Sequence, residues 1–141
     1  MPTSKASASW DGTLTKGRGS MKPDHAGEIP FSLATRFEGQ PGSSPEEVVG
    51  AALAGCFSMA LSLGLEKAGF TPVSIRSSAR VHLDKVGDGF SVTRIELSTE
   101  AKATGGDDAK FKVVAEETKK GCPISKLLSG AEITLDAKLV P

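Results

Sequence analysis

Residues 43–70, SSPEEVVGAALAGCFSMALSLGLEKAGF, form a long apolar stretch that determines the fold of the chain. Ser44, followed by Pro45 and by Glu47 three positions after the serine, is the pattern of a helix N-terminus closed by a capping box. Gly69, with a proline shortly beyond it, is a C-terminal signal. The sequence therefore predicts one long helix that begins at the proline and ends close to Gly69.

The middle of this helix is apolar almost all round, which predicts burial on every side. Its length approaches the ~20 residues of a membrane span. Small and polar residues such as Gly50, Ser58, Ser62 and Gly64 interrupt it, and they favour a packed core helix. We therefore expect no membrane partner.

The rest of the chain combines strand and helix patterns. A length of 141 residues suits one domain. Alternating apolar residues predict strands, and polar amphipathic stretches predict helices. The expected elements are a hairpin at Asp11-Gly12, a loop over 21–31, an extended piece over 32–37, strands over 73–85, 90–103 and 133–139, and helices over 107–120 and 122–128. The predicted class is α+β: a single domain over residues 1–141, with an antiparallel sheet of about six strands and one long buried helix.

A helix that is buried on all sides needs more cover than one sheet provides. A second copy of the chain is the simplest source, so we predict an obligate two-fold homodimer with the long helices paired at its centre. Gly50, Ala51, Ala54 and Gly55 would let two helix backbones approach closely. In the alternative, these small residues face strands of the same chain.

Charge and composition exclude several classes of partner and site. Lys+Arg and Asp+Glu both number 17, so nothing drives the chain toward nucleic acid. The N-terminal MPTSKASASWDG has no apolar stretch typical of a signal peptide, so we expect a cytoplasmic protein with reduced or catalytic cysteines. His25 and His82 lack the spacing of zinc ligands, so we expect no metal site.

The two cysteines lie in contrasting settings. Cys56 falls within the apolar helix, and Cys122 falls in KKGCPISKLL, where a new helix should begin. Such a pair suggests redox chemistry, although each residue alone has a simpler reading. Cys56 would be a small buried hydrophobe and Cys122 an N-cap. Arg36 would be a surface residue, and Glu46 a first-turn acid that complements the helix dipole.

Several segments resemble the OsmC/Ohr family of organic hydroperoxide reductases, most closely its OsmC branch. The resemblance runs essentially end to end, and the contexts GCFSMAL and GCP are its most specific parts. The matching segments are TRFEG (35–39), SPEEVVGAALAGCFSMALSL (44–63), EKAGFTP (66–72), LDKVGDGF (83–90), KKGCPISKLL (119–128) and AEITLDAKL (131–139).

The resemblance implies an OsmC-like, intertwined homodimer with shared active sites that reduces organic hydroperoxides to alcohols. It assigns four catalytic positions: Cys56 as the peroxidatic cysteine, Cys122 as the resolving cysteine, Arg36 and Glu46. It also implies a dithiol reductant, most simply a lipoyl group, and no metal or other cofactor. Two alternatives stay open, a carrier that binds an apolar ligand in the dimer cleft and a cysteine redox sensor.

Thiol chemistry explains why those residue types belong together. A free thiol has a pKa of about 8.5 and is only a few per cent thiolate at pH 7. Burial raises the pKa further, so Cys56 needs a cation, for which Arg36 is the candidate. Glu46 would orient the guanidinium through a bidentate pair. Cys122, at a helix start, has the more favourable local setting for a thiolate, and only the resemblance gives the first attack to Cys56.

The spacing of Glu46 and Cys56 bears on how the site is assembled. Ten residues along a helix span about 15 Å, so the two side chains do not meet within one helix. In two antiparallel helices that cross near Ala51, Glu46 of one chain would lie beside Cys56 of the other. We therefore expect a site shared between subunits.

Overall fold

The computed structural model describes residues 2–141 of the chain. The chain forms two compact units, of which the first ends at Val48 and the second covers Val49–Pro141. Each unit is described by itself below. The assignment of residues 1–141 to a single domain stays a prediction.

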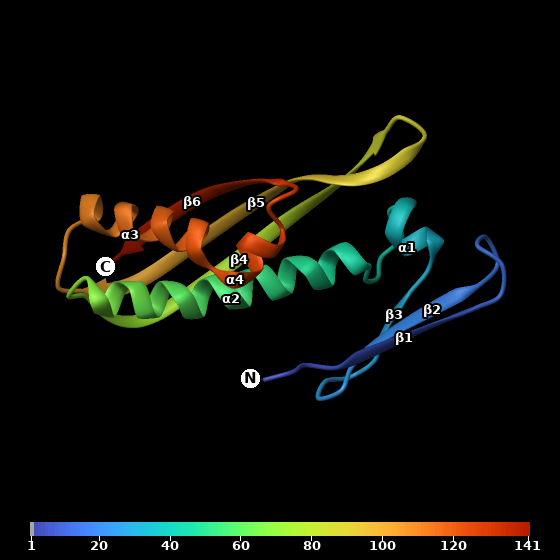
Figure 1. Cartoon of the computed structure of the whole chain (residues 1–141), viewed down its shortest axis with the longest axis horizontal. Coiled ribbons are helices and arrows are strands. Elements are labelled where there is room, and N and C mark those ends of the chain that lie inside the picture. The colour runs from blue at the N-terminus through green and yellow to red at the C-terminus, as the bar shows by residue number, and fades with distance from the viewer. Residues whose placement is uncertain (1) are drawn as a thin grey trace. The chain divides into compact units, whose positions relative to one another are not determined.

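The first unit contains a three-stranded antiparallel sheet (Figure 1). Its strands are β1 (Ala6–Asp11), β2 (Arg18–Pro23) and β3 (Ile29–Phe31), in that spatial order. The expected hairpin turns at Gly12, whose φ of 96° suits glycine. Residues 21–31 were expected to be a loop, and this prediction is wrong in part because β2 ends and β3 lies within them.

A short helix follows the third strand where the sequence suggests an extended piece over residues 32–37. Helix α1 (Leu33–Phe37) begins after Ser32, whose Oγ accepts a hydrogen bond from the Thr35 N–H at 3.2 Å. Thr35 Oγ1 accepts from the Ser32 N–H at 2.8 Å, which completes a capping box. The prediction is wrong here because threonine takes the place that glutamate or glutamine usually holds in this motif.

Helix α2 (Pro45–Lys67) begins and ends as the sequence predicts. Ser44 Oγ accepts from the Glu47 N–H at 3.1 Å, so the serine caps the helix. The Glu47 carboxylate accepts a hydrogen bond from Ser43 Oγ at 2.9 Å instead of closing the box on Ser44. At the other end Gly69 has φ 94°, which terminates the helix.

One stripe of α2 is buried within the chain, and it repeats every three or four residues: Gly50, Leu53, Phe57, Leu61 and Leu65. The opposite side is open, with Met59 80% and Leu63 53% exposed. A single chain therefore covers α2 on one side only, and its burial on every side, which needs a second copy, stays a prediction. This helix is long and apolar enough to cross a membrane, a test that core helices of soluble proteins also pass.

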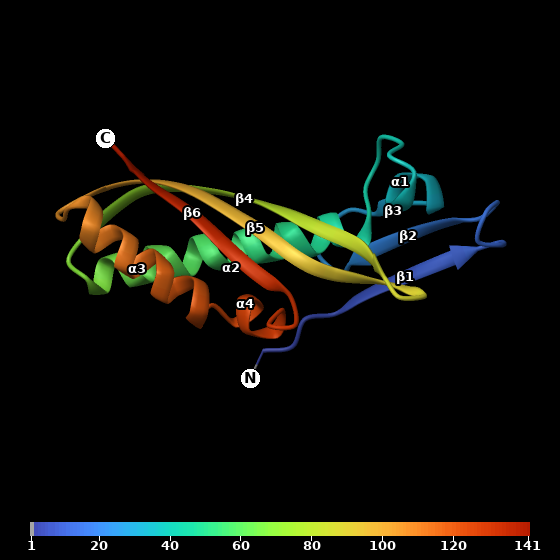
Figure 2. The ribbon, with the colours of Figure 1, turned by 90° about the horizontal axis from the view of Figure 1, so that it is seen from above.

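The second unit contains another three-stranded sheet, with spatial order β4-β5-β6. Strands β4 (Thr71–Val86) and β5 (Gly89–Thr104) form a long antiparallel hairpin, whereas β6 (Glu132–Val140) runs parallel to β5. Parallel neighbours need a crossover, which α3 (Asp108–Gly121) and α4 (Pro123–Leu127) supply (Figure 2).

The α+β class and the strand number are confirmed, and the pairing is corrected. Six strands are present in the described residues, but they form two sheets of three rather than one antiparallel sheet. Sequence alternation shows which residues share a face of a strand, and it does not show which strands are neighbours.

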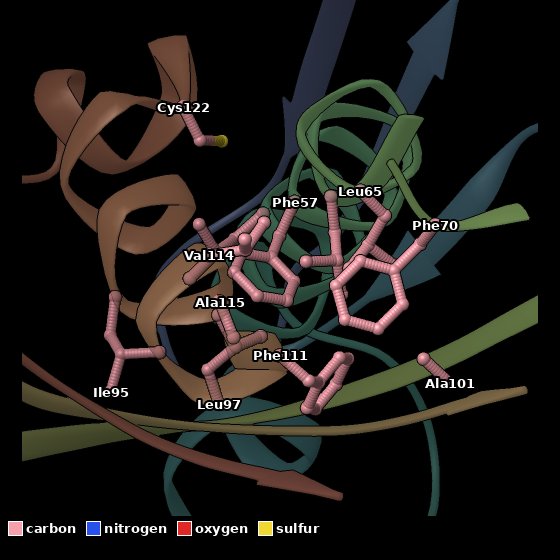
Figure 3. Packing of buried hydrophobic residues seen from close by; sticks show 12 residues of the cluster. Phe57, Leu65, Phe70, Ile95, Leu97, Ala101, Phe111, Val114, Ala115 and Cys122 are labelled. Atoms are coloured by element: carbon pink, nitrogen blue, oxygen red, sulfur yellow. The ribbon is translucent and has the colours of Figure 1, made fainter. Parts of the chain in front are cut away.

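Helices α2 and α3 lie on the same face of the second sheet, and the core fills the space between them (Figures 1 and 3). Phe57 of α2, Phe111 of α3 and Leu97 of β5 are almost fully buried there. Three polar side chains in this layer form a chain of hydrogen bonds. Ser58 donates to Ser77 at 2.7 Å, and Ser77 donates to Thr99 at 2.9 Å.

Truncating the central aromatic side chain should strongly destabilise this unit. We expect Phe57→Ala to lower the free energy of unfolding by about 3–5 kcal/mol, because it removes buried surface and leaves a cavity. Val113→Ala, on the exposed side of α3, is the matched control, with an expected change within about 0.5 kcal/mol. Urea unfolding at a fixed protein concentration measures both; equal effects would contradict this assignment of the core.

Candidate active site

Arg36 and Glu46 form a bidentate ion pair in the first unit. The capped turn of α1 carries Arg36 in its last turn, and the first turn of α2 carries Glu46. Arg36 Nε donates to Glu46 Oε1 at 3.0 Å and Nη2 donates to Oε2 at 2.8 Å. The hydrogen bonds that Arg36 donates to Glu46 raise the pKa of Arg36, against the opposing effect of burial. The pairing that the sequence predicts is therefore present, and it fixes the plane of the guanidinium.

An apolar cavity of about 220 Å³ lies beside this ion pair within the same unit. Its lining includes Trp10, Leu14, Phe31, Phe37 and Arg36. The rings of Trp10 and Phe31 pack with their centroids 5.6 Å apart, and the Arg36 guanidinium lies over the Phe37 ring at 5.1 Å from its centroid. The cavity thus combines apolar walls with one fixed cation.

Cys56 and Cys122 meet in the second unit. Cys56 lies on α2, and Cys122 lies between α3 and α4, where Pro123 begins the short helix. Their sulfurs are 2.8 Å apart, and both cysteines are free. Figure 3 shows the Cys122 side chain extending from the end of α3 toward α2. Cys122 is 1% exposed and Cys56 is partly buried. Because the two sulfurs are so close, the pair is placed for disulfide formation.

The two thiols differ in acidity. Burial, followed by the contact with Cys122, raises the pKa of Cys56, and the Ile124 amide opposes this only in part. Burial also acts to raise the pKa of Cys122, but the interactions with Cys56, with Ser125 and with the Ile124 amide outweigh it and lower that pKa. These opposite shifts make Cys122 the more acidic thiol of the pair.

The four residues that the sequence singles out thus form two pairs. Arg36 and Glu46 meet in the first unit, and Cys56 and Cys122 meet in the second. Sequence reasoning missed Ile124 and Ser125, which act to lower the pKa of Cys122. Their signal was the helix start at Cys122-Pro123, since residues in a first helical turn present free N–H groups.

Comparison with known proteins identifies the family of this chain. The family model described as "OsmC-like protein" matches residues 37–138. The chain belongs to the OsmC-like family. A curated member, peroxiredoxin OsmC of Escherichia coli strain K12, is 47% identical over 137 residues, which cover 96% of this chain and 95% of the relative.

Two solved structures share the OsmC-like fold. An organic hydroperoxide resistance protein from Elizabethkingia anophelis has a TM-score of 0.76 and 22% identity, with 99% of this chain and 98% of that chain covered. An OsmC-like protein from Mycoplasma pneumoniae has a TM-score of 0.75 and 18% identity, with 99% of each chain covered. The fold that the sequence resemblance implies is therefore confirmed.

Proposed function

We propose that this chain is a thiol peroxidase that reduces organic hydroperoxides to alcohols. The observation that carries the proposal is the pair of free cysteines, with sulfurs 2.8 Å apart in an otherwise apolar core. The names of two relatives support it: a peroxiredoxin that shares 47% identity, and an organic hydroperoxide resistance protein that shares the fold. A carrier of apolar ligands would have no use for this thiol pair.

The reaction runs in three steps. The Cys56 thiolate attacks one peroxide oxygen, the O–O bond breaks, and the alkoxide leaves as an alcohol after it takes a proton. The resulting sulfenic acid on Cys56 condenses with the Cys122 thiol, which forms a disulfide and releases water. A dithiol, most simply a dihydrolipoyl group, then returns two electrons and two protons to the cysteine pair. No metal or other cofactor takes part.

Arg36 and Glu46 supply what the cysteine pair lacks. The raised pKa of Cys56 keeps it protonated, so the first step needs a cation that stabilises the thiolate. In the shared site of the homodimer that is proposed below, Arg36 fills this role. Glu46 holds the guanidinium through two hydrogen bonds. The apolar cavity beside Arg36 would receive the organic part of the substrate, which favours alkyl or lipid hydroperoxides over hydrogen peroxide.

The test is steady-state kinetics with a dithiol as reductant. We expect turnover of cumene hydroperoxide with a kcat/KM well above that for hydrogen peroxide. Disulfide formation without turnover would identify a redox sensor, and no thiol oxidation at all would identify a carrier; either result would overturn the proposal. The cytoplasmic location and the absence of nucleic-acid and membrane partners stay predictions from composition.

The exposed apolar side of α2 supports the expected dimer. Met59 and Leu63 are largely exposed on this apolar helix, and a second copy would bury them. We propose a two-fold homodimer in which Glu46 of one chain completes the site around Cys56 of the other.

Light scattering tests this directly. We expect a mass of about twice the chain mass of 14.6 kDa at micromolar concentration. Met59→Glu, which puts a charge on the open side, should shift the population toward monomer, while Lys112→Glu on the exposed side of α3 should not. A wild-type mass of one chain would rule out the shared site.

A further inference from the structure

The rings of Trp10 and Phe31 contact each other across a glycine in the sheet of the first unit. Gly19 pairs with Trp10 on one side and with Phe31 on the other, so the three residues form one row across the sheet. Strands two places apart lie about 10 Å from each other, a gap that the side chain of the residue between them normally fills. Gly19 has no side chain, and a Cβ on it would lie only 2.6 Å from the Phe31 ring and 2.7 Å from the Trp10 ring. The two rings therefore fill the space above the glycine, with their centroids 5.6 Å apart.

The backbone of the same hairpin also lies against the indole of Trp10. A Cβ on Gly17 would lie 2.9 Å from Trp10 Nε1, so the ring runs close along the backbone of residues 17 to 19. The contacts with this backbone and with Phe31 fix the orientation of the indole. Trp10 nevertheless stays 36% exposed, and it lines the cavity of about 220 Å³ beside Arg36. A ligand in that cavity thus meets a ring that is already in place, and binding costs little side-chain entropy.

The cavity combines aromatic rings with a single charge. The chain has one tryptophan, six phenylalanines and no tyrosine, and three of these rings line this cavity, those of Trp10, Phe31 and Phe37. Among the described residues that line the cavity, Arg36 alone is charged. A ligand with one polar end is therefore oriented, with that end toward the guanidinium and its apolar part toward the rings.

Size and ring chemistry favour one kind of apolar part. Pockets for drug-sized ligands enclose about 300–1,000 Å³, so a cavity of about 220 Å³ suits a single ring better than a long acyl chain. Aromatic rings attract each other in tilted or offset arrangements with centroids about 4.5–7 Å apart, as Trp10 and Phe31 do at an interplanar angle of 52°. A saturated group of the same size lacks this attraction, whose contribution corresponds to about two- to tenfold in affinity.

We propose that Trp10 is a specificity-determining residue, and that it makes the cavity select hydroperoxides whose peroxide-bearing carbon carries an aromatic ring. Linear-chain hydroperoxides of equal carbon number are the disfavoured substrates. This inference rests on the proposed function and narrows its substrate class, and it adds no step to the reaction.

The first test uses Trp10 as its own reporter. Because the chain has no other tryptophan and no tyrosine, its tryptophan fluorescence comes from the wall of the cavity. The wild-type chain with reduced cysteines is titrated with three alcohols of equal carbon number, 2-phenyl-2-propanol, 2-cyclohexyl-2-propanol and 1-nonanol. We expect a saturable change in emission, with a Kd for the phenyl compound about fivefold below those for the other two. Equal Kd values, or an emission that does not respond to the phenyl compound, would overturn the inference.

The second test separates recognition of the ring from the chemistry of the peroxide. Cumene hydroperoxide and tert-butyl hydroperoxide react at the same kind of tertiary centre, and they differ by a phenyl group in place of a methyl group. We expect Trp10→Leu, which keeps an apolar side chain, to lower the ratio of their kcat/KM values about fivefold, mainly through a higher KM for cumene hydroperoxide. Trp10→Phe, which keeps a ring, should retain most of this ratio.

A merely structural role for Trp10 would affect both peroxides alike. The ratio in Trp10→Leu would then equal the wild-type ratio, and this result would contradict the assignment of specificity. The alcohol titration involves no peroxide and no variant, so it decides the inference even in a chain that reduces no peroxide. Equal alcohol affinities in an active peroxidase would refute the inference alone, and selective alcohol binding without peroxide turnover would refute the proposed function alone.

Discussion

Replacing Cys56 with serine is expected to abolish peroxide reduction. A serine hydroxyl is far less acidic than a thiol and forms no sulfenic acid, so neither the first attack nor the disulfide remains possible. We expect kcat/KM for cumene hydroperoxide to fall by about 10³-fold or more, to the background rate of the dithiol. The measurement is peroxide consumption under saturating reductant.

The control is Cys122→Ser, which keeps the sulfur that attacks first. Without reductant, one equivalent of peroxide should convert Cys56 of this variant to a sulfenic acid that is detected in the mass spectrum. An unmodified Cys56 in that experiment would reverse the two assignments. The lowered pKa of Cys122 makes this control necessary, because acidity alone favours Cys122 as the nucleophile.

Much of the fold follows from local signals in the sequence. The serine cap and the C-terminal glycine locate both ends of α2, because each satisfies the free backbone groups of a helix terminus. Alternation locates the long hairpin of β4 and β5. The resemblance to a family adds the pairing of Arg36 with Glu46, which the structure bears out at hydrogen-bond distance.

The errors arise where structure depends on distant residues or on unusual local chemistry. The parallel pairing of β6 with β5 follows from the crossover through α3 and α4, and no short pattern encodes it. Helix α1 depends on a threonine in a capping position.

The acidity of the cysteines is the part of the site that sequence reasoning handled least well. We expected the deciding effect on Cys56 to be a cation. Within the second unit the groups that act on Cys56 are Cys122 and the Ile124 amide, and their net effect together with burial raises its pKa. The chemistry of the proposed first step therefore depends on Arg36, which makes this arginine the most informative residue after the cysteines.

Arg36→Gln is expected to lower peroxidase activity at pH 7 strongly and to make it more dependent on pH. A guanidinium at about 4 Å contributes about 4 kcal/mol at an effective dielectric near 20, which corresponds to about 3 pKa units. Without it the raised pKa of Cys56 leaves less thiolate at pH 7 than the few per cent of a free thiol, so the rate should fall by at least about 30-fold from this cause alone. Loss of peroxide positioning would add to the decrease. The measurement is kcat/KM between pH 5 and 9.5.

The direction of the pH dependence separates these two causes. Because the variant raises the thiol pKa, the missing thiolate returns as the pH rises, and the activity of Arg36→Gln should approach that of the wild type toward pH 9.5. Any deficit that persists at high pH measures lost positioning. Glu46→Gln is the matched control: it keeps the cation but weakens the bidentate pair, so it should lower kcat/KM less and leave the midpoint closer to the wild-type value. Equal midpoints in the wild type and Arg36→Gln would show that the arginine does not ionise Cys56.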